Sequence, residues 1–372
     1  MLALAAAVLY AAYGGAILAR HGTSAFSDAG TWVAAKSHAS PTIDAHLHAH
    51  DPFGYDGEFY LAIALDPARA GSYMDLPAYR YSHIVYPLTA RALALGQPDW
   101  VPASLIVVNL LAVVLGTWAV ARLLLRQGAS PWLAGLYALY PGLVIGFAKD
   151  LTEPLAFGLA AAGLLALDNW ETPRRIWGAA ALFALAGLTR ESTLLIPVTL
   201  AAVQAMRSRR PAVATGFAVA VVGPYAAWLG IATLWQGTHG ALPSSTVGIL
   251  PFSSLASAWP PKDVWPVLGI AAPVTVLIVA CAIVLWRRRD PLVIALLVSL
   301  VAAGVYLPTR SYHDYVSSGR IQVGAVLLAL AALKALRRQP EASLLTAGAG
   351  FLAYLPLVPL VAHFFSSGLN PP

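Results

Sequence analysis

The chain has 372 residues, of which 59% are hydrophobic and only 11% are charged, and its formal net charge is +6. An ordinary soluble domain carries about 25% charged residues, because its surface must face water. The composition therefore excludes a soluble globular fold and predicts a membrane protein. The basic excess does not indicate nucleic-acid binding, because the basic residues form no patch on a soluble surface. The single cysteine, Cys281, lies in an apolar run and excludes a disulfide framework.

Apolar runs that approach the length of a membrane span recur along the whole chain. A helix rises about 1.5 Å per residue, so about 20 apolar residues cross about 30 Å of hydrocarbon. We expect an all-α polytopic membrane protein with about eleven transmembrane helices, forming a single transmembrane domain over residues 1–372. The first span lacks a basic flank and a cleavage site, which favours a retained anchor. The expected spans are 2–19, 102–125, 131–148, 154–167, 176–188, 192–206, 212–235, 266–286, 291–307, 321–333 and 344–365.

The distribution of Lys and Arg predicts the orientation in the membrane. One set of connections carries 13 basic and 4 acidic residues, a net charge of +9, and the opposite face has a net charge of −3. The positive face is expected to be cytoplasmic. This orientation places the long loop 20–101 and the Pro- and Ser-rich loop 236–265 outside, in a multi-pass protein of the bacterial cytoplasmic membrane.

Two segments of the first outer loop have helical periodicity. Residues 57–65 and 82–95 each show one apolar and one polar side, which is typical of helices that lie along the membrane surface. Asp56 then stands at the amino end of a juxtamembrane helix, where the helix dipole favours an anion. A carboxylate flanked by glycine and aromatic residues suits a general base, although Asp before a helix is also a common N-cap.

The segment 56–64, Asp-Gly-Glu-Phe-Tyr-Leu-Ala-Ile-Ala, resembles the acidic motif of the GT-C superfamily. These multi-pass glycosyltransferases use polyprenyl-phosphate sugars, and their first outer loop carries this motif on a juxtamembrane helix. The resemblance implies a GT-C-like fold and a carboxylate that activates the acceptor. Gly57 separates Asp56 from Glu58, so both acids stay candidates for the base. Tyr55 and Tyr60, which flank the acids, are substrate-binding candidates.

Two later polar runs, residues 149–154 and 188–192, lie where one expected span ends and the next begins. These span corners resemble polar runs that recur in bacterial members of the family. They add Lys149, Asp150, Glu153, Arg190 and Glu191 to the substrate-binding candidates.

Five cations near membrane level on the outer face are candidates for binding a donor phosphate. Charged groups at the ends of spans are costly and usually face a cavity or a partner, and Arg suits phosphate. The alternative is local pairing of Lys149 with Asp150 or Glu153, of Arg190 with Glu191, and of Arg310 with Asp314. The five candidates are Arg80, Lys149, Arg190, Arg310 and Arg320.

Two other polar clusters are weaker candidates. His46, His48 and His50 alternate, so an extended strand would point three imidazoles to one side, as a zinc or other divalent metal site requires. His-rich loops without metal are also common, and GT-C members differ in metal dependence, so the cofactor stays open. The polar and aromatic cluster 309–315, which contains His313 and precedes Arg320, could close over a sugar or anchor at the interface.

The predicted function is an inverting glycosyltransferase that moves a hexose or pentose from a polyprenyl-phosphate donor to a glycan, lipid or protein acceptor. The lack of a Rossmann fingerprint or P-loop agrees with a donor other than a nucleotide sugar. The principal alternative is a secondary transporter or flippase of lipid-linked sugar, although no second half of the chain mirrors the first. A phospho- or acyltransferase is a third option.

Overall fold

The computed structural model of the chain is helical, and no strand occurs among the residues that it describes. These residues are 1–36, 38–49, 52–167, 170–208, 211–237, 250–257, 264–306, 309–312 and 314–366.

In the described part of the chain, five helical segments are long and apolar enough to span a membrane. The bent pair Pro131–Ala138 and Pro141–Ala148, whose halves meet at 53°, makes a sixth if the pair counts as one span. The helices of these segments are α1 (Leu2–His21), α8 (Val101–Arg126), α9 (Ala134–Ala138), α10 (Pro141–Ala148), α14 (Pro211–Gln236), α16 (Ala272–Arg287), α21 (Pro340–Tyr354) and α22 (Leu357–Ser366).

The rest of the bundle consists of shorter helices. They are α11 (Glu153–Ala166), α12 (Pro173–Thr189), α13 (Leu195–Arg207), α17 (Pro291–Leu300), α18 (Tyr315–Ile321), α19 (Val323–Ala331) and α20 (Leu333–Leu336). Each of the eleven expected apolar runs coincides with one or more helices, so the helical prediction is confirmed. By length and composition, five or six of them suffice to span, and the count of eleven stays a prediction.

Prolines and acidic caps set where many helices begin. Pro173, Pro211 and Pro340 each occupy the first position of a helix, where the missing N–H costs no hydrogen bond. The Asp290 carboxylate accepts from the backbone N–H of Leu292 and caps α17. Asp314 caps α18 by accepting from the Ser317 N–H at 2.8 Å.

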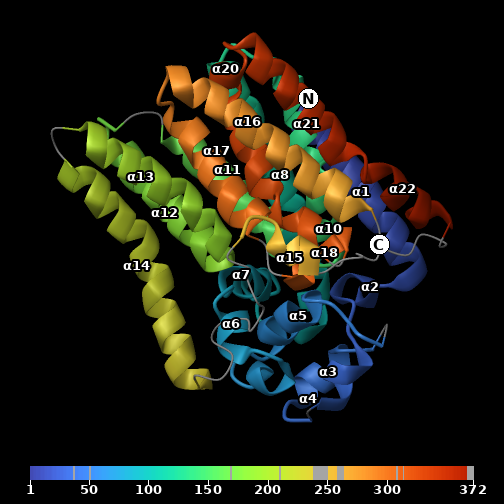
Figure 1. Ribbon diagram of the computed structural model, residues 1–372. Helices are drawn as coiled ribbons and strands as arrows, with labels where there is room; N and C mark the ends of the chain where they lie inside the picture. The colour runs from blue at the N-terminus through green and yellow to red at the C-terminus, as the bar shows by residue number, and fades with distance from the viewer. Residues whose placement is uncertain are drawn as a thin grey trace.

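The segment 20–101 folds into a layer of small helices at one end of the bundle, below the long helices in Figure 1, and this layer is called the outer layer for its place at the end of the bundle. The helix α14 reaches down to this layer, where the Trp228 indole N–H donates to the Tyr81 carbonyl at 2.7 Å. The layer consists of α2 (Ser24–Ser27), α3 (Thr31–Lys36), α4 (Pro41–His46), α5 (Gly57–Leu65), α6 (Pro77–Tyr81) and α7 (Val85–Leu93).

One expectation for this layer is wrong. All nine residues of α5 are buried, so α5 is an interior helix and not an amphipathic one on the membrane surface. It is enclosed because α2, α7 and α8 all pack against it. The helix α7 buries Tyr86, Pro87 and Ala90 and leaves Leu88 exposed, so its placement along the membrane surface stays a prediction.

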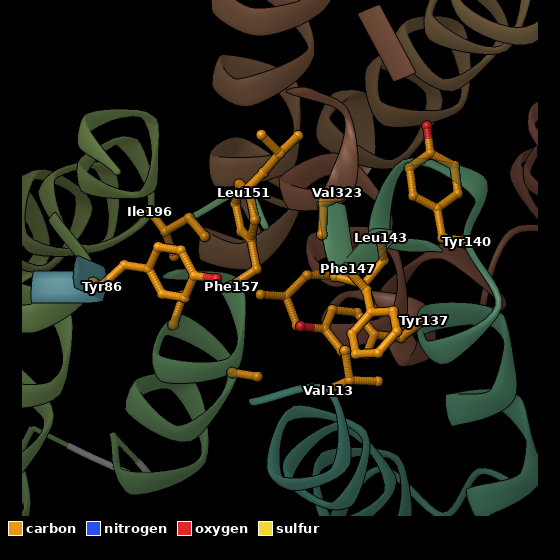
Figure 2. Close-up of a cluster of buried hydrophobic side chains, with 14 of the residues drawn as sticks. Tyr86, Val113, Tyr137, Tyr140, Leu143, Phe147, Leu151, Phe157, Ile196 and Val323 are labelled. Carbon is orange, nitrogen blue, oxygen red and sulfur yellow. The ribbon is translucent and has the colours of Figure 1, made fainter. Parts of the chain in front are cut away.

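The bundle core contains a cluster of buried hydrophobic side chains contributed by α8, α9, α10, α11 and α19. Figure 2 shows Tyr137, Phe147 and Phe157 in this cluster. Glycine lets some of these helices approach each other closely. A Cβ on Gly142 of α10 would collide with the backbone carbonyl of Gly319 on α18, and it would lie 2.8 Å from the Arg320 Cα. Backbone contact with α10 therefore fixes the segment that carries Arg320.

Candidate functional site

The Asp56 carboxylate lies at the start of α5 and is bound by two arginines. Arg80 Nη1 donates to Oδ1 at 2.8 Å, and Arg320 Nη2 donates to Oδ2 at 2.6 Å. The carboxylate makes no capping hydrogen bond to α5. Asp56 thus occupies the N-cap position of α5, but its side chain does not cap the helix and instead joins α6 to α18.

Arg80 is held on α6 by more than Asp56. Its Nε and Nη2 donate to the two carboxylate oxygens of Asp75, both at 2.9 Å, which is the bidentate geometry that suits a guanidinium. The guanidinium carbon also lies 4.2 Å from the centroid of the Phe59 ring. These contacts leave Arg80 rigidly oriented toward Asp56.

The Arg320 side chain extends from α18 to Asp56. Its Nη1 lies 3.7 Å from Glu153 Oε1, and its guanidinium carbon lies 5.1 Å from the centroid of the Tyr55 ring. The Nε and Nη1 atoms of Arg320 are buried and have no hydrogen-bond partner. Arg320 therefore keeps unused donors beside Asp56.

Glu153 and Arg190 come from the two span corners. Arg190 ends α12, and its Nη1 lies 3.7 Å from Glu153 Oε1 at the start of α11. Glu153 is 1% exposed, and neither of its carboxylate oxygens has a hydrogen-bond partner. We use the name Asp56 cluster for the set Asp56, Arg80, Glu153, Arg190 and Arg320.

Lys149 is paired, but not with the acids next to it in sequence. Its Nζ donates to Asp28 Oδ2 at 2.7 Å and lies 5.1 Å from the centroid of the Tyr55 ring. The expected pairing with Asp150 or Glu153 is therefore wrong. Asp150 has a left-handed backbone (φ 46°), and its buried carboxylate accepts from the Tyr86 hydroxyl at 3.4 Å.

Glu191 belongs to a second group of polar side chains in contact with one another, together with His83 and Tyr60. Its Oε2 lies 2.6 Å from His83 Nε2, and the other ring nitrogen of His83 lies 3.2 Å from the Tyr60 hydroxyl. His83 is fully buried. The expected Arg190–Glu191 ion pair is replaced by two separate contacts, Arg190 with Glu153 and Glu191 with His83.

The two acids of the motif have opposite electrostatic environments. Burial alone would raise the pKa of Asp56, but the Arg80 and Arg320 guanidinium groups hold that pKa well below its usual range. Burial raises the pKa of Glu58 to about 8, although Glu58 accepts a hydrogen bond from the Gly30 N–H at 2.7 Å. At neutral pH Asp56 is thus ionised, and Glu58 is mostly protonated.

The histidines do not form the expected strand. His46 is the last residue of α4, its ring contacts the Thr42 carbonyl at 2.8 Å, and Nε2 lies 2.9 Å from Asp99 Oδ1. His48 is exposed, and His50 lies outside the described residues. Within the described ranges there is no group of three or more His, Cys, Asp or Glu residues that could hold a metal ion.

The cluster at 309–315 is only partly described. His313 and the side chain of Arg310 lie outside the described part. The expected partner of Arg310, Asp314, accepts a hydrogen bond from the Ser317 N–H at the start of α18. The Tyr55 hydroxyl lies 3.5 Å from Ser317 Oγ, so α18 meets the acidic motif at two points.

An apolar groove of about 470 Å³ lies between α1, α10 and α22. Tyr13 of α1, Val144 of α10 and Phe364 of α22 are among its lining residues. The helix α10 contributes Val144 to this groove, ends next to Lys149, and packs against α18, which carries Arg320.

Three residues in the site were missed by the sequence interpretation: Asp28, Asp75 and His83. Asp75 precedes Arg80 by five residues, a local signal that could have been used. Asp28 pairs with Lys149 and His83 pairs with Glu191, each more than 100 residues away, so only the tertiary fold brings these pairs together. No protein-family model, curated protein or solved structure matches this chain.

Proposed function

We propose that this membrane protein is a glycosyltransferase of the GT-C type. It transfers a sugar with inversion from a polyprenyl-phosphate donor to an acceptor hydroxyl, on the extracytoplasmic side. The observation that carries the proposal is the ionised Asp56 carboxylate, bound by Arg80 from the outer layer and by Arg320 from the bundle. A base for the acceptor hydroxyl and cations for the phosphate leaving group thus lie within one cluster.

The proposed reaction has one bond-forming and one bond-breaking event. The acceptor oxygen attacks the anomeric carbon while its proton passes to the Asp56 carboxylate. The bond from the anomeric carbon to the phosphate oxygen breaks, and its electron pair stays on that oxygen. The donor phosphodiester thereby becomes a phosphomonoester, whose added negative charge is stabilised by guanidinium groups.

Asp56 is favoured over Glu58 as the base for two reasons. Glu58 is mostly protonated at neutral pH, since its pKa is raised to about 8, and a protonated acid cannot accept the proton. Its carboxylate also contacts the Gly30 N–H and none of the arginines of the cluster. Asp56 is ionised, and it contacts two of those arginines directly.

The arginines that bind Asp56 also weaken it as a base in the free protein. A donor phosphate placed beside Arg320 would compete with Asp56 for the guanidinium, and the loss of that partner raises the pKa of the carboxylate. Arg320 has unused donors, Nε and Nη1, with which to bind a phosphate oxygen. In this mechanism donor binding itself releases the base.

The apolar groove supports a lipid donor. Its lining residues come from α1, α10 and α22, and α10 leads from the groove to the polar residues of the site. Because lipid tails are as apolar as the groove, a polyprenyl chain could enter the groove from the bilayer without exposing apolar surface to water.

The decisive experiment is transfer of a radiolabelled sugar by the purified protein in detergent, with hexosyl and pentosyl polyprenyl phosphates as donors. Transfer in detergent cannot be transport, because no sealed compartment exists. Asp56→Asn keeps the size of the side chain but removes the basic oxygen, so turnover should fall by about 10²–10⁴ while donor binding survives.

Asp99→Asn is the matched control for this experiment, because it removes an acid of the same outer loop whose side chain is 90% exposed. We expect the control to keep full turnover. If Asp56→Asn stays active while Glu58→Gln is inactive, the role of base passes to Glu58. If both stay active, the proposed mechanism is wrong.

A further inference from the structure

The least explained group in the site is the Glu153 carboxylate. It is 1% exposed, and both of its oxygens lack a hydrogen-bond partner. Two guanidinium groups, those of Arg190 and Arg320, each lie 3.7 Å from its Oε1 atom. A buried carboxylate held only by such long contacts is under-stabilised, because neither cation donates a hydrogen bond to it.

The cation side of the same contact is also unsatisfied. Arg320 Nε and Nη1 are buried without an acceptor, while Nη2 is used by Asp56. An anion that enters between Arg190 and Arg320 can therefore accept hydrogen bonds that Glu153 does not accept. Glu153 then remains as a fixed negative charge next to that anion.

We infer that Glu153 selects ligands of the site by charge, admitting a monoanionic phosphodiester and disfavouring a dianionic phosphomonoester. The inference rests on the proposed function, in which the donor is a phosphodiester and the lipid product is a phosphomonoester. The attraction of Arg190 and Arg320 and the repulsion of Glu153 both double when the ligand carries two negative charges in place of one, so Glu153 offsets more of the attraction for a dianion than for a monoanion. Glu153 is thus a specificity residue that favours the donor and promotes release of the product.

The test compares two soluble probes with the same alkyl chain, decyl methyl phosphate and decyl phosphate. At pH 7.5 the diester is a monoanion, and the monoester is mostly a dianion, because its second pKa is about 6. Dissociation constants are measured by titration calorimetry with the full chain in detergent. The variants are Glu153→Gln, which removes the charge, and Glu153→Asp, which keeps it.

Glu153→Gln should tighten diester binding by about fivefold and monoester binding by about the square of that factor, about 25-fold, because the repulsion free energy doubles. Glu153→Asp should keep the wild-type selectivity. The control Glu341→Gln removes an exposed acid from the start of α21, and it should change neither constant.

A second measurement needs no variant. Lowering the pH from 7.5 to 5 converts the monoester into a monoanion, so the charge-dependent difference between the two probes in the wild type should disappear. Equal tightening of both probes in Glu153→Gln, or unchanged or weakened binding of both, overturns the charge-selection role. If neither probe binds the wild-type chain at any tested concentration, the phosphate site of the proposed function fails as well.

Discussion

Among single residues, the arginines of the site differ in how many of their donors are already used. Arg80 binds Asp75 and Asp56, whereas Arg320 binds Asp56 and has donors left over. An arginine with unused buried donors is better placed to receive a phosphate than one that is saturated. By this comparison Arg320 is a better candidate than Arg80 for binding the phosphate of the sugar donor.

Arg320→Ala should therefore weaken donor binding strongly. The loss of a charge-assisted hydrogen bond in a buried site costs about 2–4 kcal/mol, which is about 30- to 900-fold in the dissociation constant. Binding of a polyprenyl-phosphate sugar in detergent measures it. Arg69→Ala, at an exposed arginine of the same outer layer, is the control and should bind normally. Unchanged donor affinity in Arg320→Ala, Arg80→Ala and Arg190→Ala would mean that other groups bind the phosphate.

Glu58 gives the protein a pH-dependent stability with a defined sign. Its pKa is about 8 in the folded chain and near 4.5 when unperturbed. Between these values the folded state binds more protons than the unfolded state, so stability falls as pH rises, by up to about 1.4 kcal/mol per pH unit. The contribution is fully present below about pH 4.5, and it is lost as pH passes about 8.

The measurement is Tm in detergent between pH 5.5 and 9 for the wild type and for Glu58→Gln. The wild type should lose Tm across this window relative to the variant, because Gln has no proton to lose. Parallel Tm profiles for the two proteins would show that Glu58 keeps an ordinary pKa.

Sequence alone predicted five members of the Asp56 cluster as candidates, but it could not pair them. The cost of a charge near membrane level indicated Arg80, Arg190 and Arg320, and the resemblance of the polar run 149–154 to GT-C members added Glu153. The pairings expected from sequence neighbours failed for Lys149, which binds Asp28. A partner more than 100 residues away is chosen by tertiary packing, and one sequence carries no direct signal of it.

Among the helices, periodicity located α5 accurately but misjudged its surroundings. The predicted helix 57–65 has the observed bounds, because apolar residues recur at helical spacing directly after Asp56 and Gly57. The burial of α5 on all sides, Glu58 included, follows from α2, α7 and α8 packing around it. A hydrophobic pattern reports the helix itself and does not report how many neighbours enclose it.

The contact between α10 and α18 gives a prediction about helix packing. In Gly142→Ala the new methyl group would meet the backbone of Gly319 and Arg320, and backbone cannot move aside as a flexible side chain does. We expect a loss of about 1–3 kcal/mol in stability, a lower Tm and a loss of transfer activity as Arg320 is displaced.

Gly178→Ala in α12 is the matched control, because no neighbouring atom lies within 4 Å of the place that its Cβ would occupy. Alanine is the better helix former by about 1 kcal/mol, so this variant should equal or exceed the wild type in Tm. A Gly142→Ala protein with full stability and activity would show that α10 and α18 are not in tight contact.

For the molecule as a whole, the orientation predicted from charge can be tested by cysteine labelling. Ser72 is exposed in the outer layer, and Thr172 is exposed between α11 and α12. In a Cys281→Ser background, intact spheroplasts treated with a membrane-impermeant maleimide should label Ser72→Cys only. Thr172→Cys should react after the membrane is permeabilised. Labelling of both from outside would overturn the orientation.

The long helix α14 links the bilayer to the site through a hydrogen bond. Its Trp228 indole donates to the carbonyl of Tyr81, the residue that follows Arg80 in α6. Spanning helices answer a change in hydrocarbon thickness by tilting. We therefore expect a tilt of α14 to displace the segment of α6 that orients Arg80. The thickness of the bilayer should then change the turnover rate. In vesicles of graded acyl-chain length, wild-type activity should vary with thickness, and Trp228→Phe should flatten that response while Trp177→Phe leaves it intact.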